Sequence, residues 1–214
     1  CEKENIDIKT ITAEKLIDIY PKASTLYSDS EDFQNLAKEK NKELNNQEKI
    51  VMEQWSLLKK ISIESITETL NLLNHDFDLW LGESDVNELI EPMIKSLKKE
   101  GKLQIDDNAL VSTQNEDPKI LIAKSDGSYL YLTTDLATII DRLNNNDFDI
   151  ALYVVDSRQK LHFNQLFKTV EYFDFPKRDY QHIDFGTINN MEGKPFKTRE
   201  GGTEKLISLY NQTF

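Results

Sequence analysis

A continuous apolar run in the second half of the chain constrains the fold most strongly. Residues Ile150 to Val155 follow one another without a charged residue. Strands covered on both faces, as in a parallel sheet, have sequences of this kind. Asp156 and Ser157 end the run, and the pattern predicts a helix over 159–172 directly afterwards. A strand that leads at once into a helix is the repeating unit of doubly wound α/β folds.

The surrounding residues extend this alternation over most of the second half. Short strands are predicted at 103–105, 109–112, 120–123, 129–133 and 181–188. A turn is predicted at 125–128, where Asp, Gly and Ser gather. Thr134 and Asp135 are candidate caps for a helix over 136–143. The order strand, helix, strand, helix, strand between 129 and 188 predicts half of a doubly wound sheet, followed by a polar loop at 189–202 and a last helix at 203–209.

The first hundred residues have the apolar spacing of helices. A helix is predicted over 12–20 that stops before Pro21. The polar residues 29–32 are candidate caps for the next helix. Apolar residues between Val86 and Leu97 recur at helical spacing, and Gly101 is a typical C-terminal stop. We therefore predict an α/β protein with two parts, a helical segment over 1–102 and a nucleotide-binding half-sheet over 103–214.

Composition excludes several classes of protein. The formal net charge is −12, from 26 basic and 38 acidic residues, which argues against nucleic-acid binding by the whole surface. One cysteine and three scattered histidines predict neither a disulfide framework nor a metal site. No apolar run approaches the roughly 18 residues of a membrane span. Cys1 leaves two interpretations open, a piece of a longer protein and the lipidated end of a mature bacterial lipoprotein.

The carboxyl ends of the predicted strands select candidate site residues. In doubly wound sheets ligands bind beyond these ends, so residues 133–135, 156–159 and 185–186 are expected to converge on one crevice. Asp135 offers a carboxylate to a cationic ligand, and a helix cap is the alternative role. Gln159 and His162 are one helical turn apart and face the same way. A solvated glutamine and a half-buried histidine are their alternative roles.

The loop over 193–202 is the strongest local signal. Its sequence GKPFKTREGG holds three cations, one hydroxyl and three glycines just before a predicted helix. Cations neutralise phosphate charge, and glycines let backbone N–H groups approach it. The loop differs from a Walker A sequence, and a plain solvated loop is the alternative interpretation.

Four segments resemble the catalytic domain of class I arginyl-tRNA synthetases. They are KSDGSYLYLTTDLA at 124–137, YVVDSRQKLHF at 153–163, HIDFG at 182–186 and GKPFKTREGG at 193–202. The segments occur in the family's order with matching gaps, and the resemblance covers about residues 15–210. It implies that residues 1–102 are a helical insertion and that residues 103–214 are the second half of the Rossmann-like catalytic sheet.

The resemblance also implies roles for individual residues. Tyr131, Asp135 and Gln159 stand where the family binds the arginine side chain, and a carboxylate suits a planar guanidinium. Residues 196–200 stand where class I synthetases carry their Lys-Met-Ser-Lys-Ser loop, so Lys197 and Arg199 are the candidate catalytic cations. The implied ATP contacts, from three separate segments, are His162, His182, Phe185, Gly186, Lys194, Lys197, Thr198 and Arg199.

The implied activity is ATP-dependent formation of arginyl adenylate and transfer of arginine to tRNA(Arg). Mg²⁺ would accompany ATP as part of the substrate, the partners would be L-arginine, ATP and tRNA(Arg), and the location would be the cytoplasm. The His-x-Gly-His-type motif of class I enzymes is missing from the sequence. We therefore expect an internal fragment that is inactive alone. A guanidino-binding module, a lipid-anchored surface protein and a purely structural α/β domain are the alternatives.

Overall fold

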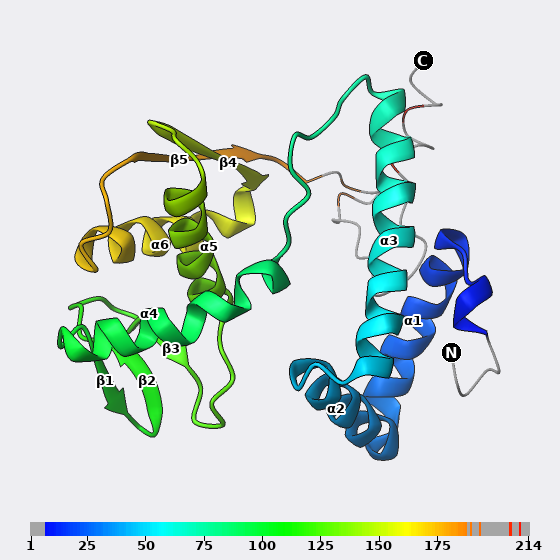
Figure 1. Ribbon diagram of the computed structural model, residues 1–214, viewed down its shortest axis with the longest axis horizontal. Coiled ribbons are helices and arrows are strands. Elements are labelled where there is room, and N and C mark those ends of the chain that lie inside the picture. Colours follow the sequence, from blue (N-terminus) through cyan, green and yellow to red (C-terminus); the bar gives the residue numbers. More distant parts are fainter. Residues whose placement is uncertain (1–6, 188, 190–192, 194–205, 207–209, 211–214) are drawn as a thin grey trace. The chain divides into compact units, whose positions relative to one another are not determined.

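The computed structural model describes residues 7–187 together with residues 189, 193, 206 and 210. The chain forms two compact units, one of Cys1–Asp78 with Ile188–Phe214 and the other of Leu79–Thr187. We call them unit 1 and unit 2 and describe each by itself (Figure 1). The functional boundary predicted between residues 102 and 103 stays a prediction, because compactness alone does not test it.

Within the described residues 7–78, unit 1 has three α-helices that contact one another. They are α1 (Ala13–Asp29), α2 (Glu31–Asn45) and α3 (Lys49–Leu72), preceded by the short 3-10 helix η2 (Ile8–Thr10). The Ser30 hydroxyl accepts a hydrogen bond from the backbone N–H of Phe33 at 3.2 Å and so caps α2 as predicted. The predicted stop before Pro21 is wrong, since α1 continues through Pro21. A proline removes one backbone hydrogen bond, and contacts with α2 and α3 outweigh that loss here.

Unit 2 contains two small sheets and three α-helices (Figure 1). Strands β1 (Leu103–Asp106), β2 (Ala109–Ser112) and β3 (Leu121–Ala123) form an antiparallel sheet, and β4 (Ile150–Asp156) pairs in parallel with β5 (Asp179–Phe185). The helices are α4 (Asn87–Lys99), α5 (Tyr131–Asn145) and α6 (Lys160–Tyr172), and two 3-10 helices are η3 (Glu83–Val86) and η4 (Ser157–Gln159). Strand β4, helix α6 and strand β5 give the parallel strand–helix–strand unit predicted from the sequence.

Local residue chemistry explains two of the turns. Asp107 and Asn108 both have positive φ, at 45° and 63°, which is the backbone of a type I′ hairpin between β1 and β2. Gly127 has a φ of 82° in the turn predicted at 125–128. There the Asp126 carboxylate accepts hydrogen bonds from the N–H and hydroxyl of Ser128, which lowers the pKa of Asp126.

The strand predicted over 129–133 is wrong. Only Tyr129 forms a β-bridge, to Ala123, and α5 begins two residues later at Tyr131. The β-branched and aromatic residues of this segment favour a strand in isolation. The side chains that α5 buries recur at helical spacing, and that burial overrides the local preference. They are Leu132, Thr133, Leu136, Ala137 and Ile139.

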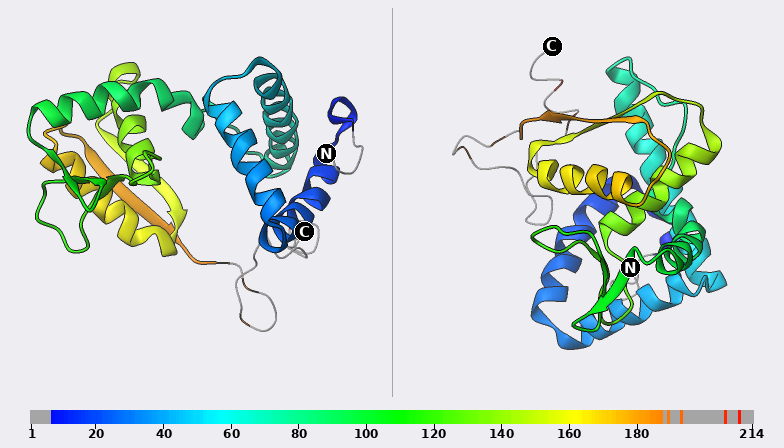
Figure 2. Two further views of the ribbon diagram at one scale, coloured as in Figure 1. Left: turned by 90° about the horizontal axis from the view of Figure 1, so that it is seen from below. Right: turned by 90° about the vertical axis from the view of Figure 1, so that its left-hand side faces the viewer.

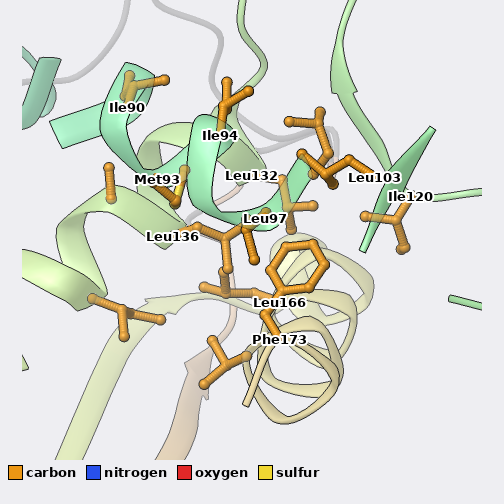
Figure 3. Close-up of a cluster of buried hydrophobic side chains, with 14 of the residues drawn as sticks. Ile90, Met93, Ile94, Leu97, Leu103, Ile120, Leu132, Leu136, Leu166 and Phe173 are labelled. Carbon is orange, nitrogen blue, oxygen red and sulfur yellow. The ribbon is translucent and has the colours of Figure 1, made fainter. Parts of the chain in front are cut away.

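One hydrophobic core joins the three helices of unit 2 to the antiparallel sheet (Figure 3). Helix α4 contributes Ile90, Met93, Ile94 and Leu97, four of the apolar residues that the sequence placed on one helical face. Leu136 of α5 and Leu166 of α6 are completely buried. Full burial of a leucine stabilises a fold by roughly 1.5–3 kcal/mol, so these two residues help to hold α5 and α6 on the same core.

Helices α5 and α6 lie on one side of the β4–β5 pair, as Figures 1 and 2 show. Tyr153, Val155 and Tyr180 pack against the core on this side. The opposite side of β4 is exposed, with Ile150, Leu152 and Val154 more than half accessible. The sequence predicted that other elements cover both faces of strand β4. Among the described residues, only the face toward α5 and α6 is covered.

Candidate functional site

The N-terminal part of α5 carries two of the predicted site residues. Tyr131 is the first helical residue and is 73% exposed, and Asp135 follows four positions later. Residues four apart lie on the same helix face, so the phenol and the carboxylate are neighbours along α5. Thr133 anchors the first turn of α5 from the opposite face, because its buried hydroxyl donates to the carbonyl oxygen of Ile122 at 2.5 Å.

Asp135 is not a helix cap. The N-cap of α5 is Leu130, and no side chain caps this end. Asp135 therefore lies beyond the first turn, where its carboxylate has no free backbone N–H of its own helix to accept from. The structural alternative that the sequence left open for Asp135 is wrong, and its carboxylate is available to other groups.

The start of α6 carries two further predicted site residues, Gln159 and His162. The Asp156 carboxylate caps η4 by accepting from the backbone N–H of Arg158 at 2.8 Å. Gln159 ends η4 and is exposed, and His162 lies three positions later in the first turn of α6. Positions three apart share a helix face, so the amide and the imidazole are neighbours along α6.

A hydrogen bond joins these two helix faces. Nε2 of His162 lies 2.6 Å from Oδ2 of Asp135, and both side chains are about one-third exposed. An ionised carboxylate only accepts, so Nε2 of His162 is the donor. The contact links the segment 133–135 to the start of α6, two of the three segments that the sequence expected to converge. The sequence did not predict the contact itself.

A group of aromatic rings packs beside His162. Phe163 is buried, and its ring centroid lies 5.2 Å from that of His162 and 4.9 Å from that of His182. Nε2 of His182 lies 3.3 Å from the carbonyl oxygen of Val155 on β4. Tyr153 also packs against Phe163, with 5.1 Å between the ring centroids, and burial raises the pKa of its phenol. His182 thus belongs to the same aromatic cluster as the ring that flanks His162.

The sequence missed an ion pair at the end of β4. Arg158 donates from Nε and from a terminal nitrogen to the two oxygens of Asp156, at 2.9 and 3.0 Å. This fork holds the pKa of Asp156 below its usual value and raises that of Arg158. The Asp-x-Arg spacing directly after a strand was the signal that could have predicted it.

The remaining predicted residues fall into two groups. Phe185 ends β5 opposite Asp156 in the parallel register and is exposed, and Gly186 follows it. The predicted loop residues Lys194, Lys197, Thr198 and Arg199 lie outside the described residues. The structure therefore joins Asp135 and His162 directly, places Tyr131 and Gln159 one turn away on the same two helix starts, and gives no position for the predicted phosphate-binding cations.

Two surface hollows of unit 2 lie elsewhere. One has a volume of about 340 Å³ and is lined by apolar residues of α4, the end of α5 and the segment after α6, including Leu97, Leu143 and Phe173. The second lies beside Phe175 and Tyr180. Neither contains a predicted site residue. Over the described part of the chain, no three metal-ligating side chains gather, and no helix is long and apolar enough to cross a bilayer.

The arrangement at the start of α5 and α6 suits a cation that carries several N–H groups. Asp135 supplies negative charge, and Oδ1 of its carboxylate accepts nothing from the residues that the structure describes. The phenol of Tyr131 and the amide of Gln159 can each accept a hydrogen bond. A planar guanidinium, with five N–H donors, matches this set of acceptors better than a point-like ammonium does.

Comparison with known proteins places the chain in a family. The family described as "tRNA synthetases class I (R), catalytic domain" matches residues 2–214, almost the entire chain. The chain belongs to this family. It therefore has the class I α/β fold, as the sequence predicted, and its relatives are ligases.

Individual relatives agree with the family assignment. The arginine–tRNA ligase of Francisella tularensis subsp. holarctica is 38% identical over 206 residues, which is 94% of this chain and 36% of the relative. That of Alkaliphilus oremlandii is 39% identical over 92% of this chain and 35% of the relative. The solved arginyl-tRNA synthetase of Plasmodium falciparum has the same fold, with a TM-score of 0.65 at 20% identity over 80% of this chain and 33% of that one. The chain thus spans about a third of the length of the curated relatives it matches.

Proposed function

We propose that this chain supplies the arginine-binding part of an arginine–tRNA ligase. The observation that carries the proposal is the hydrogen bond between His162 and Asp135, which joins the two helix starts that also carry Tyr131 and Gln159. Family membership supports the reaction class. The complete reaction joins L-arginine to tRNA(Arg) in the cytoplasm, and it needs parts of the relatives that this chain does not span.

Asp135 binds the guanidinium of arginine in this proposal. A charge-assisted hydrogen bond to a carboxylate is roughly twice as strong as a neutral one. Tyr131 and Gln159 accept further N–H groups of the same planar cation. Lysine offers one ammonium with three donors and no fork, so it leaves part of this acceptor set unsatisfied.

ATP binds beside the arginine and reacts with it. The arginine carboxylate attacks the α-phosphate, arginyl adenylate forms, and pyrophosphate leaves with the Mg²⁺ that accompanies ATP. His182, Phe185 and Gly186 form the adenine side, and Lys194, Lys197, Thr198 and Arg199 bind the phosphates, with Lys197 and Arg199 stabilising the transition state. No side chain acts as nucleophile, because catalysis here comes from positioning and charge stabilisation.

The test is Asp135→Asn in the intact ligase that carries this segment. We expect the KM for arginine in ATP–pyrophosphate exchange to rise by about tenfold or more, because a hydrogen bond between charged groups is lost. Asp141→Asn removes the same charge from another face of α5 and is the matched control. An unchanged arginine KM in Asp135→Asn, with Asp141→Asn also normal, would exclude Asp135 from the site.

A guanidino-binding module without ligase activity is the second candidate. The same set of acceptors favours it, since such a module needs only the arginine site. Titration calorimetry of this chain with arginine and with lysine separates the two. Arginine-selective binding in a chain whose longer parent shows no ATP–pyrophosphate exchange would favour the module, whereas exchange in the parent and none in this chain supports the ligase proposal.

A further inference from the structure

The contact between His162 and Asp135 assigns His162 a role other than the ATP contact that the sequence suggested. We propose that His162 is a positioning residue, which holds the Asp135 carboxylate in the orientation that receives the guanidinium of arginine. The inference rests on the proposed function of Asp135. It assigns His162 to the binding of arginine rather than to the binding of ATP.

The geometry of the pair is the first argument. Nε2 of His162 donates to Oδ2 of Asp135 at 2.6 Å, a short distance typical of a charge-assisted bond. Asp135 lies beyond the backbone donors at the N-terminus of α5, so none of them fixes its χ angles. A surface carboxylate without a partner samples several rotamers. The histidine on the neighbouring helix therefore selects one.

The imidazole is itself held in place. It meets the ring of Phe163 edge-on, with an interplanar angle of 82° and a centroid distance of 5.2 Å. Phe163 in turn packs against Tyr153 of β4 and Phe167 of α6. A donor carried by a packed aromatic cluster makes a stiff support, because rings in a close-packed core cannot shift without disturbing their neighbours.

The hydrogen bond between His162 and Asp135 also determines which carboxylate oxygen of Asp135 is left to bind the ligand. His162 occupies one lone-pair direction of Oδ2 and leaves Oδ1 without a partner among the residues that the structure describes. Because Nε2 is used by Asp135, the ring has only its other nitrogen to offer a second group. A guanidinium then meets a carboxylate of fixed direction, which is how supporting hydrogen bonds raise specificity at other binding sites.

The experiment compares three substitutions near the start of α6 in the intact ligase. His162→Leu removes the donor and keeps an apolar side chain against Phe163, whereas the amide nitrogen of His162→Gln can replace Nε2. Asn164→Leu places the same leucine at an exposed position of α6 and is the control. The KM values for arginine and for ATP are measured separately in ATP–pyrophosphate exchange.

We expect His162→Leu to raise the arginine KM about tenfold, with the ATP KM changed less than about twofold, because only the arginine contact loses its support. His162→Gln should recover most of the arginine affinity, and Asn164→Leu should resemble the wild type. In the double variant with Asp135→Asn, the loss should be smaller than the product of the two single losses, since both act through one contact.

The outcomes separate the two proposals. If Asp135→Asn raises the arginine KM but His162→Leu raises only the ATP KM, His162 is an ATP contact and the positioning role is overturned, while the proposed function stands. Equal rises in both KM values without rescue by glutamine would also overturn it, because a general loss of structure explains them. If Asp135→Asn itself leaves the arginine KM unchanged, the proposed function fails first.

Discussion

The hydroxyl of Thr133 donates a hydrogen bond to the carbonyl oxygen of Ile122 at 2.5 Å, and the threonine side chain is completely buried. This bond ties the first turn of α5 to strand β3. The same turn carries Tyr131 on its exposed side. This buried hydrogen bond therefore holds in place the helical turn that carries Tyr131, a residue of the candidate arginine site.

The first prediction concerns the stability of this anchor. Thr133→Val keeps the volume but leaves the Ile122 carbonyl without its hydroxyl partner, so the free energy of unfolding should fall by about 1–3 kcal/mol. Urea denaturation followed by circular dichroism measures it. Thr134→Val is the control, because the hydroxyl of Thr134 is 3.5 Å from its acceptor and should contribute less than about 0.5 kcal/mol. Equal losses in both variants would contradict the anchoring role.

The second prediction separates function from stability at Tyr131. The side chain is 73% exposed, so Tyr131→Phe should change the free energy of unfolding by less than about 0.5 kcal/mol. If the phenol binds the guanidinium, the arginine KM of the intact ligase should rise by severalfold while the ATP KM stays the same. Denaturation curves and ATP–pyrophosphate exchange on one preparation test both statements. A normal arginine KM would remove the hydroxyl from the proposed site.

The third prediction concerns the alkaline pH at which the hydroxyl of Tyr129 loses its proton. The Tyr129 hydroxyl donates to the Glu91 carboxylate, and burial together with this contact raises the pKa of Tyr129 to about 12. The folded state then holds the proton more tightly than the unfolded state, so this group's contribution to stability is complete below about pH 10 and is lost as the pH rises toward 12. The difference in phenolate absorbance between the wild type and Tyr129→Phe should show this late step. A difference curve centred near pH 10 would contradict the contact.

The fourth prediction concerns the acidic pH at which Asp156, the last residue of β4, becomes protonated. The side chain of Arg158 lowers the pKa of Asp156 through two hydrogen bonds. A lowered carboxyl pKa contributes stability above the unfolded value of about 4, and that contribution is lost as the pH falls through the folded value. In Arg158→Met, the Asp156 carboxyl resonance should titrate at higher pH than in the wild type. Identical NMR titration curves would show that the fork does not form in solution.

The fifth prediction concerns the uncovered side of the parallel strands. Ile150, Leu152 and Val154 are 54–62% exposed and lie on one face of β4. Contiguous exposed apolar side chains promote association. The isolated chain should therefore sediment with a concentration-dependent mass, and Val154→Lys should weaken this without lowering the unfolding midpoint. The exposed Leu161→Lys on α6 is the control, and an equal effect there would point to nonspecific association.

Much of the fold could be predicted from short-range patterns. Strand β4 and helix α6 were predicted because a long apolar run is followed by a polar break and helical periodicity. The strands β1 and β2 and the end of α4 before Gly101 were predicted for similar reasons, since strand-forming residues and helical spacing act locally. These elements depend on side chains close to one another along the chain.

The sequence by itself determined which residues are candidates for the site, because Tyr131, Asp135, Gln159 and His162 stand in motifs with fixed spacing. The tertiary structure decided that Tyr131 lies on a helix rather than on a strand, since burial of Leu132 and Leu136 overrides a local preference for strand, and that Asp135 lies inside this helix rather than capping it. It also decided that His162 donates to Asp135 across 27 positions of sequence. No local pattern encodes such a contact, because it exists only once two helices pack against the same core.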